Sequence, residues 1–385
     1  MRMLVLGAGL QGSACAYDLL QNDEVEEVVL ADLRVDALPD FLDGFRDDPR
    51  LRVVRVDAQA SDEVSAVMKG MDACMNALPY YFNLEIATLA VQAGVHYCDL
   101  GGNTGIVFDQ MKLDEKARQR NVSVIPDCGL APGMVNILAA AGIAELDDAR
   151  AVRIWVGGLP QDPQPPLNYQ IVYSLHGVLD YYTTESWVLR NGKPQQVGAL
   201  SEVEAVPFPE PVGTLEAFHT AGGLSTMPWT YEGKLETMEY KTLRYPGHAD
   251  IMLAIRELGL LELEPVTVKG QNVVPRDVFI ECAEPRLRKP ESRDLVALRV
   301  VAEGTKGGRP TRVVFDLLDY HDEETGITAM ERTTGFSLSI TGQIQARRQA
   351  LQAGVATPDL AMPADMYMDE LRRRGVDIRR RVEDA

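Results

Sequence analysis

A glycine-rich stretch near the start of the chain has the residue types and spacing to bind a dinucleotide. Gly7, Gly9 and Gly12 form the pattern G-x-G-x-x-G, with Leu10 and Gln11 inside it. The pattern lies between the apolar run 3–6 and a helical pattern, the context in which it indicates phosphate binding. The first glycine permits a tight turn, the second lets the backbone approach a pyrophosphate, and the third lets the helix pack on the strand. The N–H groups and dipole of the helix N-terminus would hold the phosphates.

Asp32, which ends the next apolar run, favours NAD over NADP as the cofactor. It follows Gly12 by about twenty residues, and its carboxylate would accept hydrogen bonds from the adenosine ribose and repel a 2′-phosphate. Arg34 stands two residues further on, and because an arginine can receive that phosphate, NADP is the second choice. The alternative interpretation is a structural glycine turn followed by a coincidental aspartate.

Further candidate ligands follow the later expected strands. Ligands of parallel sheets bind beyond the carboxyl ends of the strands. We therefore expect cofactor contacts after the third and fourth strands, from Asp57, Ala58, Asn76, Ala77 and Leu78. Asp99, after the fifth strand, could bind a substrate ammonium group or act as a base, or it could cap the following turn. Asp127, after the sixth, is a candidate substrate ligand or a residue that shapes its turn.

Length and composition indicate a globular protein of more than one domain. The chain has 385 residues, of which 46% are hydrophobic and 25% charged, as in a globular protein with more than one core. Its net charge of −19 argues against nucleic acid and anionic membranes as partners. The 5 cysteines form no C-x-x-C pair, and the histidines show no ligand spacing, so we expect neither a disulfide framework nor a metal site. No signal peptide or membrane-spanning run is apparent, and we expect a cytoplasmic location.

The elements that would position these residues fall into two groups, which together predict an α/β protein. In residues 1–126, apolar strands at 3–7, 26–32, 51–57, 72–78, 95–99 and 122–126 alternate with helical patterns at 11–21, 61–70, 80–93 and 106–120. This alternation predicts a doubly wound parallel sheet, a Rossmann domain. Residues 127–330 predict a mixed α+β domain with a largely antiparallel sheet. Its hairpin turns are expected at 191–192, 269–270 and 304–310, and its helices at 134–146, 247–259 and 275–284. Helices at 334–353 and 363–374, within the segment 331–385, are expected to return to the first domain.

Four stretches of the later sequence, together with the glycine motif, resemble the saccharopine dehydrogenase-like family. They are DCGLAPGMVN at 127–136, LEAFHT at 215–220, EYKTLRYPGH at 239–248 and MYMDE at 366–370. The resemblance runs nearly end to end, and the stretch 215–220 is similar to the lysine 6-dehydrogenase branch. It implies NAD-dependent oxidation of the L-lysine ε-amine to the 6-semialdehyde, with release of ammonia and cyclisation to a piperideine carboxylate. It also implies a homodimer paired through the second domain.

The same resemblance and the chemistry of amine oxidation suggest which residues bind the substrate. Arg244 and Tyr245 match the R-Y-x-G element of the family, whose arginine contacts substrate. A guanidinium can bind a carboxylate through two parallel hydrogen bonds, although a surface ion pair is the alternative for Arg244. Tyr80 falls where the family places substrate and nicotinamide contacts, or it is a core aromatic residue. Glu216 is a candidate ligand of the α-amino group.

A base must also take a proton during the oxidation, and three residues are candidates besides Asp99. His219 is preferred to His176 because it lies in the branch-specific stretch, and a histidine titrates near neutral pH. Lys241 can act as a base only if burial lowers its pKa, and otherwise it would hold a carboxylate. His219 as a structural residue is the alternative interpretation.

Two other functions remain open at this level. One is a reductase of the saccharopine or carboxynorspermidine type, which forms or cleaves a secondary amine. Such a substrate carries more carboxylates and should require more cationic residues than Arg244 and Lys241. The other is a nucleotide-binding scaffold without turnover, because fold alone does not determine function.

Overall fold

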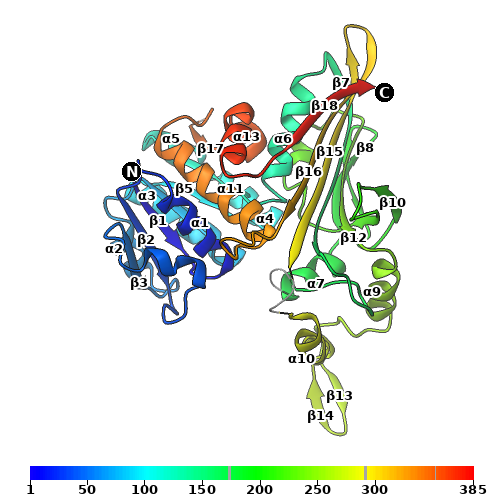
Figure 1. Ribbon diagram of the computed structural model, residues 1–385, viewed down its shortest axis with the longest axis horizontal. Helices are drawn as coiled ribbons and strands as arrows, with labels where there is room; N and C mark the ends of the chain where they lie inside the picture. The colour runs from blue at the N-terminus through cyan, green and yellow to red at the C-terminus, as the bar shows by residue number, and fades with distance from the viewer. Residues whose placement is uncertain (172–174, 290–292, 352) are drawn as a thin grey trace.

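The first domain is built on a seven-stranded parallel sheet, seen on the left of Figure 1. The computed structural model describes residues 1–171, 175–289, 293–351 and 353–385. The strand order is β17-β6-β5-β4-β1-β2-β3, and every neighbouring pair is parallel. The strands are β1 (Arg2–Leu6), β2 (Glu27–Asp32), β3 (Leu51–Arg55), β4 (Ala73–Asn76), β5 (His96–Asp99), β6 (Ser123–Ile125) and β17 (Gly354–Val355). The Rossmann sheet predicted from the sequence is confirmed, and its order reverses between β1 and β4, where such sheets bind ligands.

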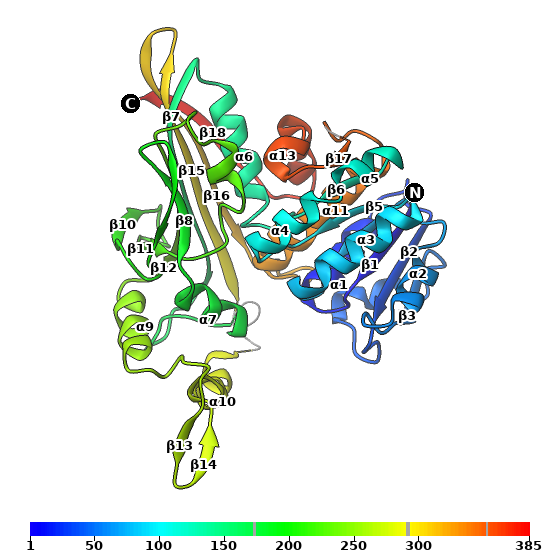
Figure 2. The same cartoon turned by 180° about the vertical axis from the view of Figure 1, so that it is seen from behind.

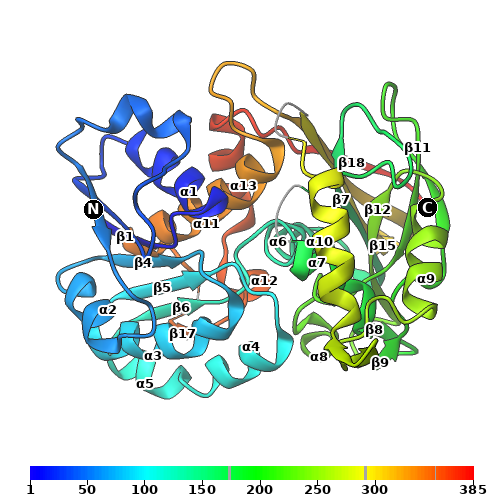
Figure 3. The same ribbon diagram turned by 90° about the horizontal axis from the view of Figure 1, so that it is seen from below.

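Helices cover both faces of this sheet, as Figure 3 shows. One face packs against α1 (Leu10–Leu20) and α11 (Ala329–Ala346), and the other against α2 (Ser61–Met68), α3 (Asn83–Ala93) and α5 (Asp114–Gln119). The central strands β1, β2 and β4 are buried because both faces of the sheet are covered, whereas the edge strand β3 is largely exposed. Two short 3₁₀ helices, Asp40–Phe45 and Tyr80–Phe82, lie in the connections. The single helix predicted at 106–120 is two helices, α4 (Thr104–Met111) and α5.

The second domain is a nine-stranded mixed sheet. Its main path is β10-β11-β12-β7-β15-β16-β18, with β8 added to β12 and β9 to β8. The strands are β7 (Asp148–Pro160), β8 (Ser186–Arg190), β9 (Lys193–Val197), β10 (Glu204–Pro207), β11 (Thr214–His219), β12 (Thr237–Arg244), β15 (Asp294–Lys306), β16 (Arg309–Tyr320) and β18 (Arg379–Asp384). Strands β7 and β12 run parallel and the other described neighbours antiparallel, which confirms the predicted mixed sheet.

The three predicted hairpins are present. Asn191 and Gly192 have φ of 51° and 73°, as a type I′ turn requires, and they join β8 to β9. The turn at 269–270 joins β13 (Val266–Val268) to β14 (Gln271–Val273), and the third hairpin joins β15 to β16. The hairpin β13–β14 projects from the body of the molecule (Figure 1).

Helices pack around the second sheet, and α6 lies between it and the C-terminal helices (Figure 2). The helices of the second domain are α6 (Met134–Ala144), α7 (Leu175–Thr183), α8 (Met227–Thr230), α9 (His248–Glu257) and α10 (Pro275–Leu287), and the C-terminal helices α12 (Pro358–Ala361) and α13 (Ala364–Arg373) pack against α6. Within the part of the chain that the structure describes, no helix combines the length and apolarity needed to cross a bilayer.

The C-terminal segment contributes to both domains. Helix α11 lies against α1, β4 and β5 of the first domain and also contacts β15 and β16. It spans Ala329–Ala346 rather than the predicted 334–353, and it is buried on nearly all sides because it is packed between two domains. A Cβ added at Gly335 would lie 2.7 Å from the Cβ of Ala14, so this glycine permits the close approach of α11 to α1. The final strand, β18, instead joins the second-domain sheet beside β16.

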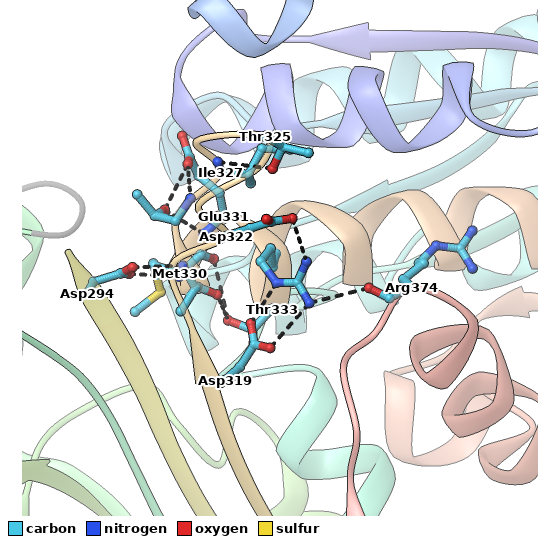
Figure 4. Close-up of polar contacts among 12 residues, drawn as sticks. Asp294, Asp319, Asp322, Thr325, Ile327, Met330, Glu331, Thr333 and Arg374 are labelled. Carbon is cyan, nitrogen blue, oxygen red and sulfur yellow. Dashed lines mark hydrogen bonds and ion pairs between the residues drawn. The ribbon is translucent and has the colours of Figure 1, made fainter. Parts of the chain in front are cut away.

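Polar contacts fix the start of α11 at the junction of the domains (Figure 4). The two carboxylate oxygens of Asp294 accept hydrogen bonds from the backbone N–H groups of Ala329 and Met330, at 2.7 and 2.9 Å. Thr328 and Glu331 form a capping box. Two of the N–H groups that a helix start leaves without intrahelical partners are thus satisfied by a strand of the second domain.

Candidate active site

A cavity of about 740 Å³ lies between the two domains. The first domain contributes the loops that follow β1, β4 and β5 to its wall, and the second contributes parts of β7, β12 and α7. The loop after β6 (129–132), the residues 220–221 that follow β11, and Met330 and Thr334 from the first turns of α11 also line it. The cavity is therefore at the carboxyl ends of the parallel strands, which is where the sequence predicts the cofactor.

One wall of the cavity is the predicted phosphate-binding turn. Six of the residues predicted to bind cofactor line the cavity: Gly9, Leu10, Gln11, Gly12, Ala77 and Leu78. Gly7 has φ of 98°, which glycine adopts without strain. A Cβ on Gly12 would collide with the carbonyl oxygen of Gly7, whereas a Cβ on Gly9 would meet nothing within 4 Å. Helix α1 has no side-chain cap, so its first N–H groups are available to phosphate oxygens.

Other predicted cofactor residues lie off the cavity wall, and the polar ones among them accept hydrogen bonds from backbone N–H groups. The carboxylate of Asp32 accepts hydrogen bonds from the backbone N–H groups of Ala8 and Arg34, at 2.7 and 2.8 Å. Asn76 is fully buried, and its Oδ1 accepts from the N–H of Leu78 at 3.2 Å. Asp57 caps its own turn by accepting from Gln59 N–H, and its neighbour Ala58 is also off the wall. These contacts shape the loops after β1, β3 and β4.

Arg244 lies on the second-domain wall, as predicted for a substrate ligand. Its Nε donates to the hydroxyl of Tyr182 at 3.2 Å, and its Nη1 donates to the carbonyl of Leu243 at 2.8 Å. The guanidinium also lies over the ring of Tyr169, 4.8 Å from its centre. These contacts fix its orientation, and its exposed fraction is 3%. Tyr80, the other predicted contact on the wall, comes from the first domain.

His219 and Lys241, predicted as catalytic residues, point away from the cavity. Side chains along a strand alternate between the two faces of a sheet. Thr220 and Thr242 line the cavity, with their hydroxyl oxygens 2.7 Å apart. Their chain neighbours His219 and Lys241 are opposite each other across β11 and β12, so they share the other face. Since neither side chain reaches the cavity, we assign no catalytic step to them.

His219 instead belongs to an ion-pair cluster on that other face. Its Nδ1 is 3.2 Å from the carbonyl oxygen of Tyr240, and its Nε2 is 3.3 and 3.6 Å from carboxylate oxygens of Glu202 and Glu239. Burial lowers the pKa of His219. The ligand atoms of these three side chains lie within 4.8 Å of one another, but Arg190 already pairs with both carboxylates. The hydrogen bond from Arg190 lowers the pKa of Glu202 to about 2. Because the arginine already neutralises these carboxylates, we assign no metal to the cluster.

Glu216 and Tyr245, predicted as substrate ligands, have structural partners instead. Both carboxylate oxygens of Glu216 accept from backbone N–H groups at the start of α9, those of Gly247 and Ala249, at 2.9 and 2.6 Å. The helix dipole favours a carboxylate there. The hydroxyl of Tyr245 donates to the carbonyl of Pro160 at 3.0 Å. Neither side chain lines the cavity.

Asp99 and Asp127 form a buried carboxylate pair directly behind the wall. Asp99 Oδ1 accepts from the backbone N–H of Asp127 at 3.1 Å, and its Oδ2 accepts from Gln110 at 2.7 Å. Asp127 Oδ2 accepts from the hydroxyl of Ser225. Its Oδ1 lies against Gly101, whose backbone is part of the wall, and has no hydrogen-bond partner among the described residues. Burial raises the pKa of both groups, that of Asp127 to about 7, with the charge of Asp99 as a second cause.

Two polar residues of the cavity wall, Asp180 and Tyr181, were not predicted from the sequence. They come from α7, together with His176 and Gly177. The positions 176, 177, 180 and 181 share one face of a helix. The opposite face, at 175, 178, 179 and 182, is buried in a hydrophobic cluster. A helical period in the stretch 175–183 could have identified this face.

The fold and this site define a two-domain, dinucleotide-dependent oxidoreductase. Family models described as the saccharopine dehydrogenase NADP-binding domain and the saccharopine dehydrogenase C-terminal domain match residues 3–125 and 129–376. The chain belongs to the saccharopine dehydrogenase family. The resemblance seen in the sequence is thereby confirmed at the level of the family.

Individual relatives are distant but cover the chain well. Saccharopine dehydrogenase (NADP⁺, L-glutamate-forming) of Schizosaccharomyces pombe is 21% identical, with 99% of each chain covered. The mitochondrial alpha-aminoadipic semialdehyde synthase of Bos taurus is 24% identical over 68% of this chain, which corresponds to 28% of that protein. Among solved structures, apo saccharopine dehydrogenase (L-Glu forming) of Saccharomyces cerevisiae matches with a TM-score of 0.80 at 18% identity over 99% of both chains. Homospermidine synthase of Legionella pneumophila, solved with NAD, matches with 0.70 at 10% identity, covering 100% of this chain and 92% of that one.

Proposed function

We propose that the protein oxidises the ε-amine of L-lysine with NAD⁺ to the 6-semialdehyde, which cyclises to a piperideine carboxylate. The observation that carries this proposal is the charge of the cavity wall. Among the residues that the structure describes there, Arg244 is the one lysine or arginine. A single guanidinium suits a substrate with one carboxylate. The balanced reaction converts the ε-ammonium form of lysine, NAD⁺ and water into the semialdehyde, NADH, ammonium and a proton.

The residues on the first-domain wall fit a nicotinamide dinucleotide. The uncapped start of α1 and the open space above Gly9 suit a pyrophosphate. The carboxylate of Asp32 stands at the end of β2, where it would meet the adenosine ribose, and this supports NAD rather than NADP. When bound, the cofactor would accept a hydride from the substrate carbon. The matching domain model and the S. pombe relative carry NADP in their names, so the preference for NAD has to be measured.

In this proposal the chain holds the substrate and manages its protons. Arg244 would bind the carboxylate and fix one end of the molecule, so that the amine end reaches the loops after β4 and β5. The amine must lose its proton before its carbon can be oxidised. Asp127 does not line the cavity, but its Oδ1 lies directly behind Gly101 of the wall, so it would take the proton through one bridging water, and its pKa of about 7 suits that role. Asp99 would help to position Asp127, because its carboxylate accepts a hydrogen bond from the backbone N–H of Asp127.

The second candidate function is the oxidation of saccharopine, which the names of the relatives favour. A secondary amine that joins two amino acids carries more than one carboxylate. With one arginine and no lysine on the described wall, the cavity lacks the cations expected for such a substrate.

The test is formation of NADH or NADPH by the purified protein with L-lysine, saccharopine or L-ornithine, each with NAD⁺ and with NADP⁺. We expect turnover with L-lysine and NAD⁺, with one ammonium released per NADH. Turnover with saccharopine alone would assign the second function. Binding of NADH without oxidation of any amine would leave a nucleotide-binding scaffold.

We also propose a homodimer paired through the second domain. Large apolar side chains are exposed on that domain around the hairpin β13–β14, including Leu258, Leu260, Leu263, Val266 and Val268. Such a set supports association. The molar mass in solution, from light scattering, should be twice that of the chain, and a monomer across micromolar concentrations would contradict the proposal.

A further inference from the structure

One face of α7 lines the cavity and carries polar side chains. Positions 176, 177, 180 and 181 line it, whereas Val178, Leu179 and Tyr182 are buried against α9 and α10. The helix is therefore oriented by its apolar face. This orientation places the carboxylate of Asp180 on the second-domain wall, the same wall that carries Arg244.

The carboxylate of Asp180 is held in place by a buried arginine. Arg276 of α10 donates from Nη1 to Asp180 Oδ1 at 2.6 Å, and its side chain is 7% exposed. Arg276 is itself fixed, because its Nε donates to the carbonyl of Leu261 at 2.8 Å and its Nη2 donates to Thr183 Oγ1 at 3.1 Å. The side chain of Asp180 is 46% exposed, and its Oδ2 has no protein partner in the described ranges. One oxygen is thus anchored while the other can accept from a ligand.

We propose that Asp180 binds the α-ammonium group of the substrate while Arg244 binds its α-carboxylate. Among the described wall residues, Asp180 is the one aspartate or glutamate, and Arg244 is the one lysine or arginine. A cation and an anion on one wall complement a zwitterion, which is the head group of an α-amino acid. Glu216, the ligand predicted for this group, is occupied at the start of α9. The inference rests on the proposed function and names the part of the substrate that the cavity selects.

Asp180 is better suited to the α-ammonium group than to the reacting amine. A nearby carboxylate stabilises an ammonium ion and so opposes its deprotonation. That effect helps to hold a group that stays charged, but it hinders a group that must become neutral before oxidation. The reacting end must also lie near the cofactor loops of the first domain, whereas Asp180 belongs to the second-domain wall.

The experiment compares ligands that differ only in the α-ammonium group. L-Lysine and 6-aminohexanoate are the substrate pair, and L-norleucine and hexanoate are a non-reacting pair, measured by thermal shift in the presence of NADH. The variant is Asp180→Asn, which keeps an acceptor for Arg276. The matched control is Asp316→Asn, because Asp316 also accepts from an arginine, Arg299 at 2.6 Å, but lies outside the cavity.

We expect Asp180→Asn to lower kcat/KM for L-lysine roughly tenfold or more and to change that for 6-aminohexanoate less than about twofold. The wild type should bind L-norleucine more tightly than hexanoate, and the variant should lose that difference. Equal losses for both substrates, or an unchanged norleucine preference, would overturn the assignment. If the wild type does not oxidise L-lysine, the proposed function fails, whereas the norleucine comparison still decides the role of Asp180.

Discussion

The buried pair of Asp99 and Asp127 is the most unusual group of residues near the cavity. Two carboxylates in one buried place oppose each other's ionisation. Asp99 is compensated by hydrogen bonds to both of its oxygens. Asp127 keeps one oxygen without a partner in the described chain, and its pKa of about 7 lies in the range where a base is effective at neutral pH.

We predict that Asp127→Asn lowers kcat/KM roughly 100-fold or more. In the wild type, kcat/KM should rise as the pH rises through about 7, because Asp127 accepts a proton only after losing its own. The variant should lose this limb of the pH profile, which initial rates between pH 5 and 9 would show. A variant with the wild-type profile would mean that another group titrates. Asp316→Asn serves as a control here also.

The same substitution should stabilise the fold at alkaline pH. The pKa of Asp127 is about 7 in the folded state and about 4 in an unfolded chain. Between these values the folded state binds more protons, so the stability contributed by this group is present below about pH 4 and lost as the pH rises to 7. Asparagine does not titrate, and Asp127→Asn should gain about 4 kcal/mol relative to the wild type at pH 8 but not at pH 4. Urea unfolding at both pH values measures this, and an equal change at the two would contradict it.

In the proposed function, Asp32 is the residue that would favour NAD⁺ over NADP⁺. Asp32→Asn keeps an acceptor for the Ala8 N–H but removes the charge that would repel a 2′-phosphate. We predict that the ratio of kcat/KM for NADP⁺ to that for NAD⁺ rises about tenfold, equivalent to about 1.4 kcal/mol. Steady-state kinetics with both cofactors test this. A wild type that already prefers NADP⁺ would show that Arg34 outweighs Asp32.

At the scale of the elements, substitutions of two glycines in the β1–α1 turn should have different effects, one on the stability of the fold and the other on the affinity for NADH. Gly12→Ala would force its Cβ against the carbonyl of Gly7, so we predict a loss of about 2 kcal/mol or more in stability. Gly9→Ala meets no atom within 4 Å, but its methyl group would occupy space beside the start of α1 that a pyrophosphate needs.

We therefore expect Gly9→Ala to unfold like the wild type while its affinity for NADH falls roughly tenfold or more. Thermal unfolding and NADH fluorescence titration provide the two readouts. Gly44→Ala is the matched control, because it also meets nothing within 4 Å and lies off the cavity. Normal NADH affinity in Gly9→Ala would show that the phosphates lie elsewhere.

The first-domain elements were predictable because each strand there is short, apolar and followed by a polar loop. The position of a loop after a strand was enough to identify Ala77 and Leu78 as wall residues, and the resemblance to the family identified Tyr80. In the second domain, the stretches 215–220 and 239–248 that resemble the family indicated where strands lie, but not which face of the sheet each side chain occupies. Once Arg244 is placed on the cavity side of β12, the alternation of a strand directs Lys241 to the other side, and the sequence analysis did not apply this constraint.

The start of α11 is marked in the sequence by a capping box, although the apolar periodicity predicts a later start. Thr328 and Glu331 have the spacing of a capping box, which marks a helix beginning five residues before the predicted position 334. The helix is buried on nearly all sides, so its apolar residues do not follow one stripe. The pairing of β17 and β18 with different sheets depends on distant segments, which no local pattern encodes.

At the scale of the whole molecule, α11 joins the two domains into one core. A single hydrophobic cluster contains Met3 and Cys15 of the first domain, Leu298 and Phe315 of the second, and Leu338 of α11 between them. The cap from Asp294 ties the start of that helix to β15. The two walls of the cavity are therefore fixed relative to each other, and we expect one cooperative unfolding transition for the chain.

The residues 1–126 should consequently not fold alone, although they contain six strands of the parallel sheet. Without α11, one face of β4, β5 and α1 is exposed to water, and without β17 the edge of β6 is unpaired. We predict that this fragment binds ANS, lacks near-UV circular dichroism and does not bind NADH. Fusing residues 327–376 to it through a flexible linker should abolish ANS binding and restore the near-UV circular dichroism and NADH binding, because that segment carries α11 and β17. A fragment 1–126 that folds cooperatively and binds NADH would show that the nucleotide-binding wall is independent of the C-terminal segment.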